Sequence, residues 1–246
     1  MGRLIWQEAK VVEVRPETAR VASLVLDVPA WAGHRAGQHV DVRLTAEDGY
    51  QAQRSYSIAS APSSPLTLTV ERIEDGEVSP YLVGELRAGD TFELRGPIGG
   101  YFVWDADGAR AAVPLLLVAG GSGVVPLAAM VRHRVAAGSA TPVRLVYSSR
   151  SIDDVIYRDQ LDGLAATGDG VEVIHTLTRS QPPGWTGYAR RIDATLLAEV
   201  AWPATAAAAA FVCGPTRFVE TVAAGLLGLG YEPGRIRTER FGPTGG

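Results

Sequence analysis

Sulfur ligands and clustered histidines are scarce in this chain of 246 residues. Its single cysteine, Cys213, excludes an intrachain disulfide and an iron–sulfur cluster held by the chain's own thiolates, which takes about four. The histidines, His34, His39, His133 and His175, show no ligand spacing such as HExxH. We therefore expect no protein-bound catalytic metal.

An excess of positive charge and long apolar runs are also missing. The formal net charge is −4, whereas nucleic-acid binding calls for a basic surface, so we expect no nucleic-acid partner. No apolar run approaches the roughly 18 residues of a membrane span, and charges interrupt the N-terminal stretch MGRLIWQEAKVVEVRPE, unlike a signal peptide. We expect a cytoplasmic protein without a membrane partner and take a monomer as the default.

Short segments of alternating polarity fill the first part of the chain, with turn signals such as EDGY and EDGE between them. Their spacing of about 8 to 12 residues predicts an antiparallel barrel or sandwich. The strands are expected at 10–16, 20–28, 38–46, 53–60, 66–74 and 91–97. A short helix is expected at 78–86, with Ser79 as its N-cap and Pro80 at its first position.

From about residue 112 the pattern changes to apolar strands alternating with amphipathic helices. This alternation predicts a doubly wound α/β domain, a parallel sheet covered by helices on both faces. We expect strands at 114–121, 143–149, 171–177, 209–214 and 235–241, and helices at 126–138, 153–164, 193–200 and 216–230. We expect a loop at 204–210 and a boundary in the polar stretch 104–111, which divides the chain into domains 1–106 and 107–246.

The stretch VAGGSGVVP ends the first predicted parallel strand. Gly121, Gly123 and Pro126 occupy the spaced positions of a GxGxxG fingerprint, with Ser122 and Val125 between them. Such glycines let the backbone approach a pyrophosphate at a helix N-terminus. A nucleophile elbow would need glycine two residues after Ser122, where Val124 stands. A methyltransferase would need an acidic residue closing the second strand, which instead ends VRLVYSSR. We interpret the loop as a nucleotide site.

Ordered motifs connect the two halves: RSYS, GEVS, GPIGGYF, GGSGVVP, CGP and a terminal ERFG. In this order they resemble the ferredoxin–NADP⁺ reductase superfamily over nearly the whole chain. The resemblance implies an antiparallel FAD-binding β-barrel followed by the NAD(P)-binding α/β domain. It also implies a flavoprotein oxidoreductase in which hydride passes from NADPH to FAD and electrons leave one at a time to a separate iron–sulfur or haem protein.

The resemblance assigns the first flavin contacts to RSYS. Arg54 would pair with the pyrophosphate, Tyr56 would pack on the isoalloxazine ring and Ser57 would hydrogen-bond near its N5. A planar cation, a flat ring and a hydroxyl suit these tasks. Further expected contacts are Ser55, Val70, Glu71, Arg72, Val78 and Ser79. The alternatives are a plain helix cap at Ser79 and solvated strand residues at 71 and 72.

The nicotinamide side of the resemblance lies in CGP and ERFG, at strand ends where doubly wound sheets bind ligands. The residues implied are Cys213, Gly214, Pro215, Glu239 and Phe241. Ser57, Cys213 and Glu239 are thereby the catalytic candidates, with a positional rather than a nucleophilic role for the cysteine. A small buried residue ending a strand is the alternative for Cys213.

The strand end that reads the ribose 2′ position in dinucleotide folds carries Ser148 and Arg150 instead of an acid. Arg179, after the next strand, resembles the second phosphate-contacting arginine of NADPH-using relatives. NADPH is therefore the expected donor, and a solvated surface charge is the alternative for either arginine. We expect Asp153 and Asp154 in the first turn of the following helix, where they would complement its dipole.

Two other functions stay open. A flavin reductase or diaphorase would act on free flavin or small acceptors. Its flavin would behave as a substrate and would not be retained through gel filtration. A nucleotide-sensing module without turnover would purify colourless and would not bleach added flavin with NADPH. The choice of FAD over FMN follows from the resemblance alone.

Overall fold

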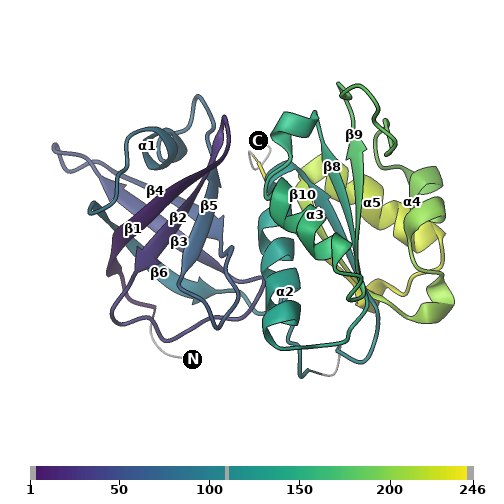
Figure 1. The fold of residues 1–246 in the computed structure, drawn as a ribbon. Helices are drawn as coiled ribbons and strands as arrows, with labels where there is room; N and C mark the ends of the chain where they lie inside the picture. The colour runs from purple at the N-terminus through teal and green to yellow at the C-terminus, as the bar shows by residue number, and fades with distance from the viewer. Residues whose placement is uncertain (1–3, 109–110, 243–246) are drawn as a thin grey trace.

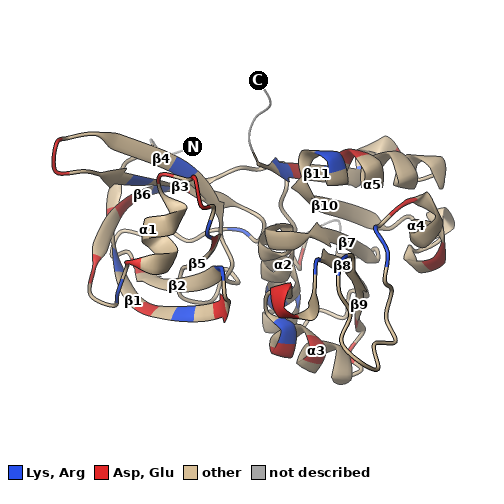
Figure 2. Cartoon of the chain, turned by 90° about the horizontal axis from the view of Figure 1, so that it is seen from above, with Lys and Arg blue, Asp and Glu red and all other residues tan. Residues whose placement is uncertain are grey.

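The computed structural model describes residues 4–108 and 111–242, which form two sheets from consecutive parts of the chain. In Figure 1 the first sheet, in purple and blue, stands beside the second, which carries the teal to yellow helices. Acidic and basic residues are interspersed over both parts in Figure 2. Every helix of the described residues is too short or too polar to span a bilayer.

The first sheet is antiparallel, with six strands in the order β4-β3-β6-β1-β2-β5. The strands are β1 Gln7–Thr18, β2 Val21–Asp27, β3 His39–Thr45, β4 Gln51–Ser57, β5 Thr67–Glu71 and β6 Thr91–Ile98. A bridge between Ile58 and Leu68 joins the two edge strands, so the sheet closes into a barrel. The alternating pattern produces this fold because every second side chain enters one apolar core. The predicted antiparallel barrel is confirmed.

Helix α1, Ser79–Gly84, is shorter than the predicted 78–86 and begins differently. Val78, and not Ser79, occupies the N-cap position, and no side chain caps the helix. The Ser79 hydroxyl instead accepts a hydrogen bond from the Ile73 N–H at 3.0 Å and so closes the preceding turn. Val78 and Leu82 are buried in the barrel core, so apolar burial holds this helix in place.

The second sheet is parallel, with five strands in the order β11-β10-β7-β8-β9. The strands are β7 Leu115–Gly120, β8 Val143–Ser149, β9 Val171–Leu177, β10 Ala209–Pro215 and β11 Ile236–Phe241. Helices α2 Val124–Ala136 and α3 Arg158–Ala166 pack on one face, and α4 Ala194–Val200 and α5 Thr216–Gly228 pack on the other. Short 3₁₀ turns are η1 Gly121–Gly123, η2 Ile152–Asp154, η3 Ala204–Ala206 and η4 Pro233–Arg235. The predicted doubly wound domain is confirmed.

The helix predicted over 153–164 begins only at Arg158, so that part of the prediction is wrong. Asp153 and Asp154 lie in the turn η2 and not in the first turn of an α-helix. Tyr157 then takes a left-handed conformation with φ 60° before α3 starts. The side chains of residues 155–157 are buried in the core shared by the two domains, and this burial pulls the segment out of a helix.

The alanine-rich stretch 204–210, predicted as a loop, is also partly regular. It contains η3, and its last two residues, Ala209 and Ala210, begin β10. These two alanines pair with Leu115 and Leu116 of β7 and are buried, because small side chains fit the middle of a sheet covered on both faces.

The two domains share one apolar cluster. Ala36, Phe102 and Trp104, from the end of the barrel, pack with residues of α2 such as Met130. The approach is close enough that a Cβ on Gly37, whose φ is +98°, would lie 2.0 Å from the Phe102 carbonyl oxygen. A boundary at residues 106 and 107 stays a prediction.

Candidate functional site

The carboxyl ends of β7 and β10 are neighbours in the middle of the parallel sheet. The strand order reverses there, because β8 and β9 follow on one side and β11 lies on the other. Doubly wound sheets bind ligands at such a switch point. The predicted segment Gly121–Gly123 follows β7, and Gly214 and Pro215 are the last two residues of β10, so the two segments meet at one crevice.

The loop after β7 needs glycine for two physical reasons. Gly121 has φ +56°, a conformation that residues with a Cβ rarely adopt. A Cβ on Gly123 would lie 2.2 Å from the Cys213 carbonyl oxygen, so only glycine lets the start of α2 approach β10. Val125 and Pro126 are buried, and Pro126 has no N–H, so these two residues shape the helix start more than they offer groups to a ligand.

A cavity of about 320 Å³ lies over this crevice, and both domains line it. The predicted residues that line it are Glu71, Gly121, Ser122, Ser148, Arg150, Pro215 and Phe241. Further lining residues are Thr18, Arg20, Val21, Gly120, Ser149, Asp154, Ile156, Thr178 and Phe218. The structure thus brings the glycine loop, the β8 end and the chain's last strand together around one space.

Several residues that line the cavity lie outside the sequence motifs. Thr18 and Arg20 lie at the turn between β1 and β2, and only the packing of the two domains places them at the cavity. Phe218 packs against the crevice, because a Cβ on Gly214 would meet its ring Cδ1 at 2.7 Å. In the sequence, the one sign of this contact is that Phe218 follows Gly214 of CGP by four residues.

Arg150 and Arg179 are neighbours across the ends of β8 and β9, where the Arg179 N–H donates to the Arg150 carbonyl at 2.9 Å. Both side chains are exposed, and neither guanidinium has a hydrogen bond or ion pair with another described residue. Arg150 lines the cavity, whereas Arg179 stands outside it. The carboxylate of Asp154 also lines the cavity and accepts a hydrogen bond from the Ser151 hydroxyl at 2.6 Å.

The RSYS motif lies on β4, where side chains alternate between two faces. Tyr56 packs against the barrel core, and this burial raises its pKa, so the phenol stays protonated. Arg54 is exposed and donates to Glu77 Oε2 at 2.5 Å. The Ser55 hydroxyl is engaged within the barrel wall, where it donates to Asp41 Oδ1 at 2.6 Å.

The start of α1 lies next to Arg54, since Glu77 contacts that arginine and directly precedes the N-cap residue, Val78. The N–H groups of Val78 and Ser79 donate to no other described residue. An arginine and two free amides are together a suitable site for a phosphate. Arg72 stands apart from this group in an exposed ion pair with Glu74 at 3.1 Å.

The predicted adenosine contacts on β5 have different environments. Val70 is fully buried in the barrel core, so a contact with a cofactor would come from its backbone. The next residue, Glu71, lines the cavity over the crevice and therefore faces the second domain. These two residues and Ser55 were predicted from the resemblance alone, and their contacts with a cofactor stay a prediction.

Cys213 and Glu239 are paired in register on β10 and β11. Burial, with a further contribution from Glu239, raises the pKa of the Cys213 thiol well above its ordinary value, so the sulfur stays a neutral thiol. Burial also raises the pKa of Glu239 to about 7. The Glu239 Oε2 atom is buried and has no hydrogen-bond partner among the described residues. This carboxyl can therefore hold or release a proton near neutral pH.

Two family models match the chain: an oxidoreductase FAD-binding domain over residues 8–103 and an oxidoreductase NAD-binding domain over residues 117–224. The barrel and the doubly wound sheet are thus the FAD-binding and NAD-binding domains of an oxidoreductase. The chain is 35% identical to ferredoxin–NADP reductase B of Sorangium cellulosum over 242 residues, which cover 95% of this chain and 97% of that protein. It belongs to the ferredoxin reductase-like superfamily.

Some relatives are longer, and others have the same length. The chain is 31% identical to the glycine betaine monooxygenase reductase subunit of Pseudomonas aeruginosa, over 96% of this chain but 64% of that protein. A solved structure, the flavohem-like FAD/NAD-binding domain of nitric oxide dioxygenase from Vibrio cholerae, is similar with a TM-score of 0.85 and 26% identity, over 96% of this chain and 99% of that one. The shared unit in these comparisons is therefore the pair of domains seen here.

Proposed function

We propose that this protein uses NADPH to reduce bound FAD and passes electrons one at a time to a separate redox protein. The observation that supports the choice of donor is the pair Arg150 and Arg179, two guanidiniums without a described partner at adjacent strand ends beside the cavity. A 2′-phosphate distinguishes NADPH from NADH, and arginine binds phosphate through two parallel hydrogen bonds.

The residues present fit both cofactors. Arg54 with the amides of Val78 and Ser79 would hold the FAD pyrophosphate, and Tyr56 would support the flavin ring. Bound FAD supplies the redox chemistry, hydride uptake from the nicotinamide and the release of single electrons. The glycine loop would hold the nucleotide's pyrophosphate at the start of α2, and Arg150 and Arg179 would hold its 2′-phosphate.

Two catalytic candidates act near the crevice in this proposal. Cys213, which stays a neutral thiol, would form part of the surface on which the nicotinamide lies. Glu239 can hold a proton at neutral pH, at the half-buried position beside Cys213 on β11. The remaining candidate, Ser57, would offer its hydroxyl to the flavin from the end of β4.

The acceptor is proposed from the chemistry of the chain and from its relatives. The single cysteine of these two domains cannot hold an iron–sulfur cluster. We propose that the one-electron metal centre belongs to a separate protein. Relatives are named as a ferredoxin–NADP reductase, as oxygenase reductase subunits and as a cytochrome P450 reductase of Amycolatopsis, which is 25% identical with a TM-score of 0.84. An iron–sulfur or haem protein is therefore the proposed class of acceptor.

The test of the donor is kcat/KM for NADPH and NADH in the wild type, Arg150→Ala and Arg179→Ala. Each substitution should lower kcat/KM for NADPH by about tenfold or more and change the value for NADH little, because only the 2′-phosphate loses a contact. Arg87→Ala, an exposed arginine on the barrel, is the matched control and should change neither value. A wild type that uses NADH equally well or better overturns the choice of NADPH.

One observation favours a second function, a flavin reductase that releases its flavin. The Glu77 carboxylate forms an ion pair with the Arg54 guanidinium, and it also accepts a hydrogen bond from the Tyr50 hydroxyl. A flavin pyrophosphate would have to replace this internal anion, which weakens flavin retention. Gel filtration decides between the two functions: flavin that elutes with the protein supports the first, and flavin that elutes separately supports the second.

A further inference from the structure

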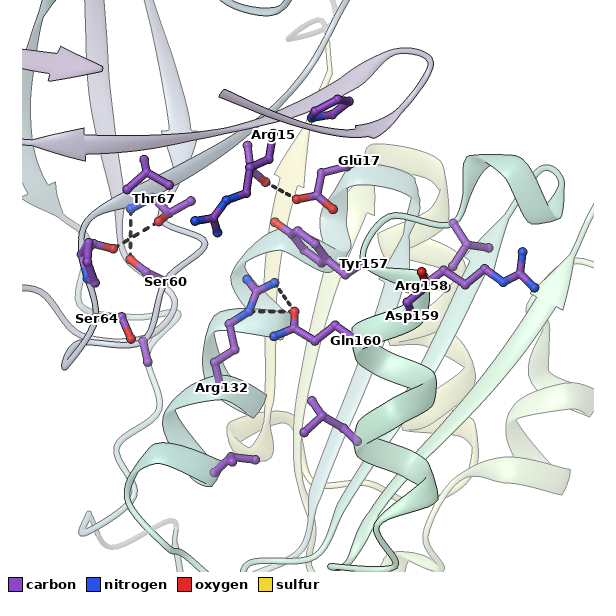
Figure 3. A pocket seen from close by; sticks show the side chains of 18 of the residues that line it. Arg15, Glu17, Ser60, Ser64, Thr67, Arg132, Tyr157, Arg158, Asp159 and Gln160 are labelled. Atoms are coloured by element: carbon purple, nitrogen blue, oxygen red, sulfur yellow. Dashed lines mark hydrogen bonds between the residues drawn. The ribbon is translucent and has the colours of Figure 1, made fainter. Parts of the chain in front are cut away.

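A second and larger cavity, of about 900 Å³, lies between the domains on the side of β2, β5, α2 and α3. It is open and polar in places, and Figure 3 shows the side chains that line it. None of the predicted flavin or nucleotide residues takes part in its lining. The function proposed above therefore leaves the polar groups at this boundary unexplained.

A chain of hydrogen bonds, buried except at its Glu17 end, crosses from the second domain into the barrel here. The Tyr157 hydroxyl donates to Thr69 Oγ1 at 2.5 Å, Thr69 and Ser23 share a hydrogen bond of 2.7 Å, and Ser23 donates to Glu17 Oε1 at 2.5 Å. Because Ser23 already gives its proton to the carboxylate, Thr69 must donate to Ser23. The hydroxyls of Thr69 and Ser23 thus each accept one hydrogen bond and donate another, with the carboxylate of Glu17 as the final acceptor.

Arg132 of α2 completes this arrangement. Its guanidinium lies 4.1 Å from the centroid of the Tyr157 ring and donates to the Ala59 carbonyl of the barrel at 2.5 Å. In Figure 3, Tyr157 lies between Glu17 and Arg132, which also contacts Gln160. We name Glu17, Ser23, Thr69, Arg132 and Tyr157 the interdomain clasp.

The backbone of Tyr157 shows that the clasp determines local structure. Its φ of 60° is left-handed, which is uncommon for a bulky residue, and its side chain is 6% exposed. Glycine and asparagine adopt a left-handed conformation readily, but this position is a tyrosine. The contacts of its ring and hydroxyl must therefore stabilise the conformation. Burial raises the pKa of the phenol, which keeps the hydroxyl protonated as a donor.

Both ends of the clasp lie close in sequence to residues that line the smaller cavity over the crevice. Tyr157 ends the segment that follows β8, whose end carries Ser148 and Arg150, and Thr69 lies two residues before Glu71. We infer that Tyr157 and Thr69 are positioning residues: they fix the α/β domain against the barrel so that the nicotinamide meets the flavin in reacting geometry. This inference rests on the proposed function.

The physical reason lies in how each step uses the domains. The glycine loop and the arginines that would bind the nucleotide belong to the α/β domain alone, so nucleotide affinity does not require the clasp. Hydride transfer needs the reacting atoms about 3–3.5 Å apart, and here those atoms sit on different domains. Loss of the clasp should therefore lower the limiting rate of flavin reduction and leave nucleotide affinity nearly unchanged.

The test uses Tyr157→Phe and Thr69→Val in the flavin-loaded protein, mixed rapidly with whichever nucleotide reduces the wild type. Each variant should reduce its flavin about five- to tenfold more slowly at saturating nucleotide, the effect of one lost buried hydrogen bond. Thr69→Ser, which keeps the hydroxyl, should restore the rate. Tyr231→Phe is the matched control, because it removes a hydroxyl that donates to the Trp202 carbonyl at 2.7 Å within one domain.

A double variant and a structural readout complete the test. Because the two hydroxyls act as one contact, Tyr157→Phe with Thr69→Val should be no slower than the worse single variant. Amide hydrogen exchange in β5 and in residues 151–157 should quicken in Tyr157→Phe and not in Tyr231→Phe, whatever the activity. Wild-type rates, equal losses in the control, or weaker nucleotide binding in place of slower reduction would overturn the inference. A wild type that neither nucleotide reduces would instead overturn the proposed function, and the exchange comparison would still decide the clasp.

Discussion

Glu239 makes the stability of this protein depend on pH. Its pKa of about 7 lies above the ordinary 4.5, so the folded state holds the proton more tightly than the unfolded chain. The stability should therefore fall as pH rises from about 4.5 to about 7 and stay low above that range. Glu239→Gln removes this loss: the variant should gain little over wild type near pH 4 and about 3 kcal/mol near pH 8. Urea unfolding at the two pH values measures the difference, and an equal gain at both would contradict the prediction.

Cys213 lies where a small change should affect reduction without affecting flavin content. Cys213→Ser keeps the size of the side chain but changes the surface beneath the crevice, so flavin reduction by the nucleotide should slow severalfold. Rapid mixing measures the rate, and absorbance of the purified variant measures its flavin. Reduction at the wild-type rate would leave Cys213 as a core residue at a strand end, which its 2% exposure also allows.

Arg54 should control how tightly the flavin is held. Arg54→Ala removes a charge-assisted contact worth about 1.5–3 kcal/mol, so FAD affinity should fall roughly ten- to a hundredfold. Glu77→Gln is the informative partner, because it removes the anion that occupies Arg54 and should raise affinity a few fold at most, as for an exposed ion pair. Fluorescence titration of flavin-free protein gives both values. An Arg54→Ala protein that purifies with its full flavin content would rule out this residue as the anchor.

The turn between β7 and α2 is the element with the least room for change. Gly123→Ala would place a Cβ 2.2 Å from the Cys213 carbonyl oxygen, so the helix start must move. We expect a loss of stability of about 1–3 kcal/mol together with weaker nucleotide binding. Gly163→Ala in α3, where a Cβ meets nothing within 4 Å, should instead stabilise the protein by about 0.5–1 kcal/mol. Thermal unfolding and nucleotide titration of both variants check this contrast.

Elements with a clear local pattern were predictable from the sequence, and elements fixed by distant contacts were not. Alternation predicted the barrel strands, and continuous apolar runs predicted the parallel ones, because each pattern reflects which faces are buried. The prediction of a helix over 153–164 was wrong because Tyr157 forms a hydrogen bond with Thr69, which lies 88 positions away in the sequence. Ser79 looked like a cap, but its hydroxyl bonds to Ile73.

The candidate site divides in the same way. Gly121, Gly123 and Pro215 follow from motifs, because a turn beside a phosphate restricts the local backbone. Thr18 and Arg20 reach the nucleotide cavity only through domain packing, and a single sequence carries no sign of that packing. The unusual pKa of Glu239 likewise arises from burial that becomes visible only in three dimensions.

The whole molecule is held together by an apolar contact between its halves. Phe102 and Trp104 of the barrel's last segment lie in the same core cluster as α2. Residues 1–106 and 107–246 expressed separately should therefore each expose an apolar patch and be poorly soluble, whereas co-expression should recover a complex. Gel filtration of the separate and co-expressed halves checks this, and two well-behaved monomers that ignore each other would contradict it.

The seam of the barrel has a consequence for the protein without its flavin. β4 and β5 meet at the Ile58–Leu68 bridge and through the Ala59 N–H, which donates to the Thr67 carbonyl. Beyond that end, within the described sheet, β4 pairs with β3 alone and so leaves the backbone edge of Arg54–Ser57 open. An open edge is a template on which another chain can add a strand. The flavin that is proposed to bind Arg54, Tyr56 and Ser57 would cover this edge. Flavin-stripped protein should therefore scatter more light on warming than flavin-loaded protein. The supply of flavin in the cell would then limit aggregation as well as turnover.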